Sequence, residues 1–149
     1  MNKTTKGKAK GFTLIEIMIV IAIVAILASL AVPAYNDSVN RARRADAKIA
    51  LEKAAAMQEQ HYYQANQYTD ILNDIGGTGG SLSSPEGNYN ITVAFTDVAN
   101  PRAGYLLTAT ATSAGAMKDE DCYSYSLTSF GQKSAFKKSG VANDEACFR

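Results

Sequence analysis

An apolar segment of membrane-spanning length lies close to the N-terminus of this chain. Of the 21 residues from Phe12 to Val32, only Thr13, Glu16 and Ser29 carry polar side chains. A helix of this length rises about 31 Å, which matches the roughly 30 Å hydrocarbon core of a bilayer. The segment therefore predicts a helix that crosses a membrane once.

The residues before this segment are basic. Positions 1–11 contain no acid and hold four lysines: Lys3, Lys6, Lys8 and Lys10. The whole chain of 149 residues has 15 basic and 14 acidic side chains, so 11 basic groups face 14 acidic ones in the remainder, a formal charge of −3. Because basic flanks resist translocation, we expect the lysines in the cytoplasm and the chain beyond the segment outside it.

Glu16 is the one charged residue of the apolar segment. A carboxylate there costs about 2.5–3.5 kcal/mol on insertion scales, and the neighbouring residues Ile15 and Ile17 offer no cation. The side chain either reaches toward the lipid headgroups or pairs with a cation from another molecule. A free α-amino group at a newly made N-terminus, four residues away in the sequence, would be such a cation.

The run KGFTLIEIMIV, from Lys10 to Val20, resembles the prepilin processing motif of type IV pilins. The resemblance implies that prepilin peptidase removes residues 1–11 as a leader by cutting between Gly11 and Phe12. It also implies that Phe12 is then N-methylated, and that Glu16 pairs with a neighbour's N-terminus during filament assembly. Ordinary signal peptides are cut behind their apolar region, whereas this cut keeps the apolar helix on the product.

A conventional signal-peptidase cut is the competing interpretation. Cleavage after Ala31 or Ala34 would release a soluble periplasmic protein. Glu16 is a poor residue for the apolar region of such a signal peptide. The residue that opens the mature chain distinguishes the two interpretations.

Helix-forming residues resume directly after Pro33, which closes the membrane segment 12–33. We therefore predict a kink or local melting at this proline, and an amphipathic helix over residues 34–64. An apolar stripe at near-helical spacing is expected to pack this part on a sheet, rather than to form a free coiled coil. The members of the stripe are Tyr35, Val39, Ala42, Ile49 and Met57.

Three arginines follow the membrane segment: Arg41, Arg43 and Arg44. Their place close to the bilayer favours contact with lipid headgroups or with an acidic patch on an adjacent subunit. A solvated helix face is the alternative.

Residues 65–149 are predicted to form a globular head, in which residues 66–88, rich in Asn, Gly, Ser and Asp, form a surface loop. Alternating patterns predict a small antiparallel sheet of three to four strands. The predicted strands are 89–95, 105–112, 122–128 and a short one at 133–136. The fold class is thus α+β: a long N-terminal helix, membrane-spanning in its first half, packed on an antiparallel sheet and followed by a C-terminal disulfide loop.

Cys122 and Cys147 bound that loop, region 122–147. Two cysteines in an extracytoplasmic head favour one disulfide over two unpaired buried thiols, and it would contribute about 3 kcal/mol. Type IV pilins have a similar C-terminal disulfide loop. The preceding carboxylates Asp119, Glu120 and Asp121 match no calcium loop, so we interpret them as a solvated acidic turn.

Candidate catalytic groups are sparse. One histidine and two cysteines are too few for a Cys/His zinc cluster, and the acidic residues show no paired spacing for hydrolysis. We therefore expect no enzymatic activity, no bound metal and no cofactor. The head is acidic, and its one basic grouping is Lys133, Lys137 and Lys138. Direct DNA binding is therefore not expected.

Among type IV pilins, residues 41–48 and 59–69 and the final Cys147-Phe148 resemble the minor pilins more than the main subunit. This implies a structural subunit that joins a type IV pilus or primes its assembly, and so supports adhesion, twitching motility or DNA uptake. A major pilin and a type II secretion pseudopilin are the alternatives. The implied partners are other pilin subunits, the inner-membrane assembly platform and prepilin peptidase/methyltransferase. The implied location is the inner membrane, single-pass with a cytoplasmic N-terminus, and then the extracellular pilus.

Overall fold

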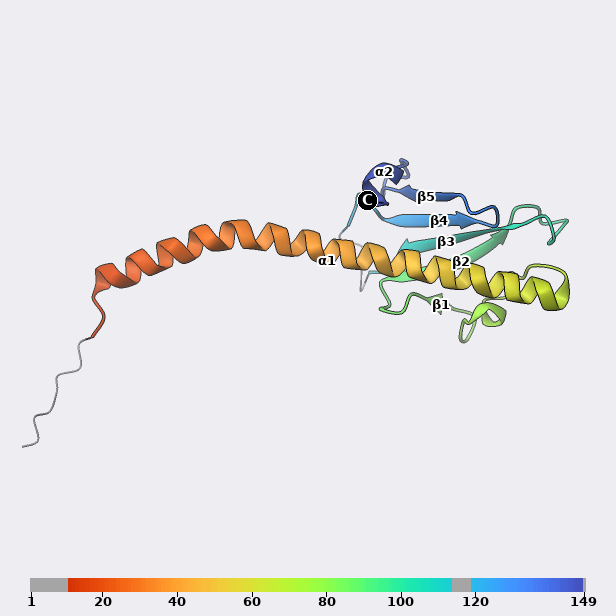
Figure 1. The fold of residues 1–149 in the computed structure, drawn as a ribbon, viewed down its shortest axis with the longest axis horizontal. Helices are drawn as coiled ribbons and strands as arrows, with labels where there is room; N and C mark the ends of the chain where they lie inside the picture. The colour runs from red at the N-terminus through yellow and green to blue at the C-terminus, as the bar shows by residue number, and fades with distance from the viewer. Residues whose placement is uncertain (1–10, 114–118, 149) are drawn as a thin grey trace, which may run out of the picture. The chain divides into compact units, whose positions relative to one another are not determined.

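The computed structural model describes residues 11–113 and 119–148, so most of the basic leader predicted at 1–11 lies outside the described residues. A long helix, α1 (Leu14–Ala65), precedes a five-stranded sheet, which confirms the α+β class (Figure 1). The other elements, in chain order, are η1 (Leu72–Ile75), β1 (Leu82–Ser83), β2 (Tyr89–Phe95), β3 (Tyr105–Ala111), β4 (Ser124–Thr128), β5 (Lys133–Phe136) and α2 (Asp144–Cys147).

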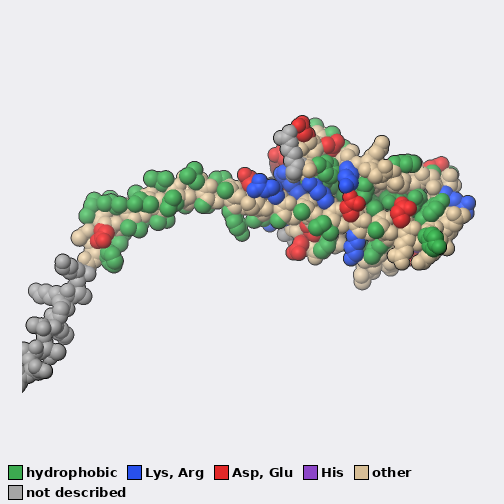
Figure 2. Space-filling view, viewed as in Figure 1, with side chains coloured by type: hydrophobic (Ala, Val, Ile, Leu, Met, Phe, Trp, Pro, Cys, Tyr) green, Lys and Arg blue, Asp and Glu red, His purple; other side chains and the backbone are tan. Residues whose placement is uncertain are grey.

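The chain divides into two compact units, Met1–Ser38 and Val39–Arg149. In the first unit, the described part of α1 is lined with apolar side chains that the chain itself does not cover (Figure 2). The exposed fraction is 63% for Ile15 and 70% for Leu30. The most apolar 18-residue window of α1 has a mean hydropathy of 2.9 with none of it buried, so this helix is long and apolar enough to cross a membrane.

Helix α1 continues through Pro33 without a break. The continuation that the following helix formers predict is therefore confirmed, while a kink at the proline stays a prediction. The helix ends at Ala65, one residue beyond the expected boundary. Asn66 follows with a φ of 54°, a left-handed conformation that asparagine tolerates and that commonly ends helices.

The sheet is an antiparallel meander in the order β1-β2-β3-β4-β5. Tyr125 of β4 pairs with Ala109 of β3 on one side and with Ala135 of β5 on the other. Strands β2 to β5 were predicted, but the expected total of three to four was too low. The additional strand β1 has two residues, Leu82 and Ser83, too few to show an alternating pattern, and it lies in the segment predicted as loop 66–88.

One face of the sheet packs against the second half of α1 (Figure 1). The helix contributes small or medium apolar side chains, Ala47, Ala50, Leu51 and Ala54, and the sheet supplies large ones such as Tyr89. The predicted packing stripe was therefore largely wrong. Within it, Tyr35 is 71% exposed and Ile49 is 59% exposed, whereas Met57 packs partly against the core. These side chains share one buried cluster with Tyr89, Tyr105 and Tyr125 of the sheet.

Candidate functional site

The start of α1 is closed by a reciprocal pair of hydrogen bonds between Thr13 and Glu16. The Glu16 amide donates to Thr13 Oγ1 at 3.3 Å, and the Thr13 amide donates to Glu16 Oε2 at 3.4 Å. This is a capping box, which satisfies two amides that a helix N-terminus leaves without partners. The Thr-x-x-Glu spacing ahead of an apolar run was a readable signal that the sequence interpretation of Glu16 missed.

Gly11 and Phe12 lie just ahead of this cap and are exposed. The Phe12 side chain is 81% exposed, and a Cβ built on Gly11 would meet no atom within 4 Å. The packing of the described chain therefore does not require glycine at position 11. Any requirement for it would have to come from another molecule.

At the other end of the chain, Cys122 and Cys147 form a disulfide with a Cα–Cα distance of 5.7 Å, which confirms the predicted pairing. Both cysteines are fully buried. Phe148, the next residue, stacks edge-on against Tyr125 with ring centroids 5.7 Å apart. The Lys48 ammonium of α1 lies over the same ring, 5.2 Å from its centroid. The disulfide region is thus packed against both the sheet and the helix.

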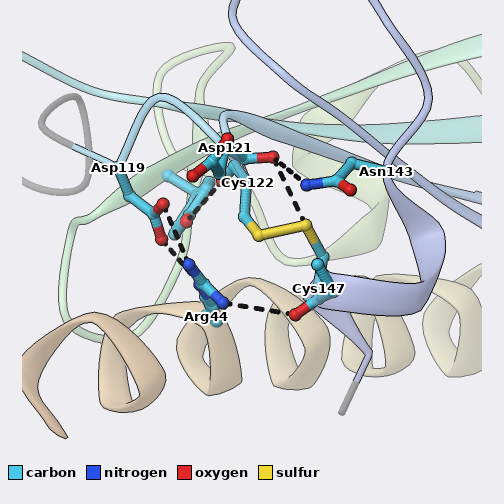
Figure 3. Close-up of polar contacts among 8 residues, drawn as sticks. Arg44, Asp119, Asp121, Cys122, Asn143 and Cys147 are labelled. Carbon is cyan, nitrogen blue, oxygen red and sulfur yellow. Dashed lines mark hydrogen bonds and ion pairs between the residues drawn. A yellow bond between two sulfur atoms is a disulfide. The ribbon is translucent and has the colours of Figure 1, made fainter. Parts of the chain in front are cut away.

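Arg44 of α1 joins this region to the helix (Figure 3). Its Nε and Nη2 atoms donate to the two carboxylate oxygens of Asp119 at 2.6 Å and 3.1 Å. Its Nη1 donates to the carbonyl of Ala146 at 3.3 Å. The hydrogen bond to Asp119 raises the pKa of Arg44. Arg44 thus engages an acid of its own chain, rather than the lipids, neighbouring subunit or solvent that the sequence suggested.

The acidic turn is only partly solvated. Asp119 is 5% exposed, so the solvated interpretation was wrong for this residue, whereas Glu120 and Asp121 are exposed. Lys138 Nζ lies 3.6 Å from Glu120 Oε1, and Lys137 Nζ lies 2.8 Å from Asp121 Oδ1. The Lys137 contact lowers the pKa of Asp121. Among the described residues, no group of three or more His, Cys, Asp or Glu side chains is placed to hold a metal ion.

The basic grouping of the head is engaged by acids of the same chain. Lys137 and Lys138 bind the acidic turn, and Lys133 Nζ lies 2.6 Å from Glu52 Oε1 on α1. These contacts lower the net positive charge that a polyanion would meet at this surface.

Two buried polar side chains of α1, Asp46 and Gln58, anchor the segment between helix and sheet, and no local pattern in the sequence indicates either of them. Asp46 accepts hydrogen bonds from Ser84 Oγ at 2.6 Å, the Glu86 amide at 3.2 Å and Asn88 Nδ2 at 3.1 Å. Further along, Gln58 Nε2 donates to the Thr69 carbonyl at 2.6 Å, and its Oε1 accepts from the Thr69 amide at 3.1 Å.

Beside Asp46, an open groove of about 630 Å³ separates α1 from residues 85–88. The helix side of the groove presents Val39, Ala42 and Ile49, and the opposite wall includes Pro85. Part of the apolar stripe predicted to pack on the sheet thus lines a groove that is open to solvent.

Comparison with known families gives two matches. Residues 6–32 match the prokaryotic N-terminal methylation motif. Residues 33–126 match the family described as type IV minor pilin ComP, DNA uptake sequence receptor. Together the two matches extend from the leader across the helix and most of the head.

Similar individual proteins are pilins. The type IV major pilin protein PilA of Myxococcus xanthus is 39% identical over 67 residues, covering 45% of this chain and 30% of PilA. A PilE1 major pilin of Neisseria gonorrhoeae is 37% identical over 110 residues, covering 74% and 57%. The type IV major alpha-pilin of Moraxella bovis is 36% identical over 104 residues, covering 65% of each chain. The chain thus spans between 30% and 65% of the length of these relatives.

Among solved structures, a type IV pilin from Shewanella oneidensis aligns with a TM-score of 0.46 and 23% sequence identity. The alignment covers 63% of this chain and 89% of that one.

Proposed function

This chain belongs to the type IV pilin family, and we propose that it is a minor pilin that joins a type IV pilus or primes its assembly. The match of residues 33–126 to a minor-pilin family carries the proposal. A major pilin is the first alternative, because the relatives at 36–39% identity bear that description. A type II secretion pseudopilin is the second.

Maturation begins at the N-terminus. Prepilin peptidase cuts between Gly11 and Phe12, and the new Phe12 amine is methylated. The match of residues 6–32 to the methylation motif and the exposure of both residues support this step. The leader lysines leave with the cut, so the mature helix no longer carries a basic end that resists extraction from the inner membrane.

Assembly follows from the first half of α1. Its apolar side chains lie uncovered by their own chain, so they remain stable in lipid or among the helices of other pilin subunits. When the assembly platform moves the subunit from the inner membrane into the filament, contacts with lipid are replaced by contacts with the helices of other subunits. Glu16 then pairs with the N-terminus of a neighbour and fixes the axial register of the helices.

DNA binding is the second candidate function, because the matched family is described as a DNA uptake sequence receptor. The pairing of Lys133, Lys137 and Lys138 with Glu52, Asp121 and Glu120 argues against it. We therefore propose that the chain supports adhesion, twitching motility or DNA uptake through the filament. Salt-dependent retention of the purified chain on DNA would overturn this choice.

Mass spectrometry of purified, sheared filaments tests the proposal. We expect peptides from this chain at a small fraction of the main subunit, with a first peptide that begins at methylated Phe12. Equal or greater abundance than every other pilin would assign it as a major pilin. An N-terminus at Val32 or Tyr35, with the chain absent from filaments, would support a secreted periplasmic protein instead.

A further inference from the structure

Arg44 contacts both chain segments that carry the disulfide cysteines (Figure 3). Asp119 precedes Cys122 by three positions, and Ala146 directly precedes Cys147. The guanidinium binds the carboxylate of the first residue and the carbonyl of the second. One side chain of α1 therefore holds together two segments that the sequence places far apart.

A second polar contact joins the same two segments without involving the sulfur atoms. Asn143 Nδ2, on the Cys147 side, donates to the carbonyl of Asp121 at 3.1 Å. The two segments are therefore cross-linked by polar contacts on both sides of the disulfide. The Arg44 contacts are the stronger of the two, because a bidentate bond between two charged groups exceeds a neutral amide bond.

The position of the segment that carries Asp119 depends on Arg44, because the Asp119 carboxylate is buried. The Asp119 side chain is only 4% exposed, and the Arg44 side chain is 22% exposed. Without the guanidinium, the Asp119 carboxylate would be buried without a cation. The free-energy cost is large enough to displace the segment that carries Asp119 toward solvent. Cys122 lies on that segment and would move with it.

We propose that Arg44 is a positioning residue for the disulfide: it aligns the thiols of Cys122 and Cys147 before the bond forms and protects the bond against reduction. With glutathione disulfide as the oxidant, each thiol gives up a proton and an electron and the two sulfurs bond. The glutathione disulfide accepts the two protons and two electrons, and its sulfur–sulfur bond breaks to give two molecules of reduced glutathione. Alignment raises the effective concentration of one thiol at the other, because the reduced segments are already held in place.

The experiment equilibrates the full-length chain, in detergent, with graded mixtures of reduced and oxidised glutathione and traps free thiols with a maleimide. We expect Arg44→Gln to lower the effective thiol concentration by at least about fivefold, in line with the loss of charged hydrogen bonds. Arg44→Lys keeps the charge but not the two-pronged geometry, and should fall in between. Arg43→Gln is the matched control, since Arg43 instead lines the groove beside residues 85–88.

A purely structural role for Arg44 predicts a different pattern. It would lower the melting temperature equally with and without the cysteines, and leave the glutathione equilibrium unchanged. We expect the opposite: a smaller loss in a Cys122→Ser, Cys147→Ser background than in the disulfide-bonded chain, because the two contacts support each other. Asp119→Asn, which keeps the side-chain shape, gives the second measurement if Arg44→Gln does not fold. An effective thiol concentration within twofold of wild type in the folded variant would overturn the proposal.

Discussion

The two halves of α1 form one continuous helix, but they differ in what covers their apolar side chains. In the first half, large side chains such as Ile15 and Leu30 are mostly exposed, and the described chain offers them no cover. In the second half, alanines and Leu51 pack in the core, and Arg44, Asp46 and Gln58 each bind a segment outside the helix. The first half therefore depends on molecules outside the chain, whereas the second is stabilised by the chain itself.

Gly11→Val is expected to have the largest effect, because it blocks the step that releases the first half for assembly. A valine side chain would obstruct a peptidase cleft that fits glycine, whereas the chain itself has room for it. We expect complete retention of the leader, measured as unprocessed mass and an N-terminus upstream of Phe12. A product that begins at Phe12 from this variant would contradict the proposed cut site.

Substitution of Glu16 tests whether the first half needs a partner for its one charge. Glu16→Ala should leave cleavage intact but strongly reduce incorporation into filaments, measured by immunoblotting of sheared pili. Glu16→Gln is the informative companion, because glutamine still completes a capping box but carries no charge. We expect it to incorporate as poorly as Glu16→Ala. Normal incorporation of Glu16→Gln would mean that Glu16 acts through the helix cap alone.

The sequence predicted features with local signatures: the processing motif, the continuation of α1 past Pro33, and strands β2 to β5. It did not predict the anchors of the head. Arg44 and Asp119 are 75 positions apart, and Asp46 and Ser84 are 38 apart. No periodic pattern encodes which distant loop a polar side chain will reach. The buried face of α1 was predicted wrongly because the bulky residues suggested a core. The apolar residues that α1 buries are instead three alanines and Leu51, and Ile49 stays exposed.

Cys122→Ser tests how much the disulfide contributes to the stability of the head on which the second half of α1 packs. Opening the loop closed by Cys122 and Cys147 should destabilise the head by about 3 kcal/mol on chain-entropy grounds. A shift on a nonreducing gel reports loss of the bond, and a melting curve of the full-length chain in detergent reports the loss of stability. An unchanged melting temperature would show that the surrounding contacts hold the region without the disulfide.

Asp46→Ala removes a polar anchor from the same half. It would leave the Ser84 hydroxyl, the Glu86 amide and the Asn88 amide group without their acceptor, and we expect a loss of about 2 kcal/mol in the free energy of unfolding. Asp46→Asn retains one acceptor oxygen and should cost less. Chemical denaturation of both variants provides the comparison. Equal stability of Asp46→Ala and wild type would show that the 84–88 segment does not depend on this anchor.

Tyr125→Phe should have the smallest effect at neutral pH and a distinct one in alkali. The Tyr125 hydroxyl is buried and has no hydrogen-bond partner in the described part of the chain, so its removal should change stability by less than about 1 kcal/mol, toward greater stability. Burial raises the pKa of Tyr125, as it does for Tyr89 and Tyr105.

The raised pKa values set the sign of the pH dependence. An unfolded tyrosine loses its proton near pH 10, while the folded form still holds it, so stability should fall as the pH rises above about 10. Tyr125→Phe removes one of these groups and should make the fall shallower, measured by urea denaturation at pH 8 and pH 11. Tyr63→Phe, at a side chain that is 92% exposed, is the control and should leave the slope unchanged. Equal slopes for Tyr125→Phe and wild type would mean that Tyr125 gains access to water before the head unfolds. The head would then open locally more easily than its packing indicates.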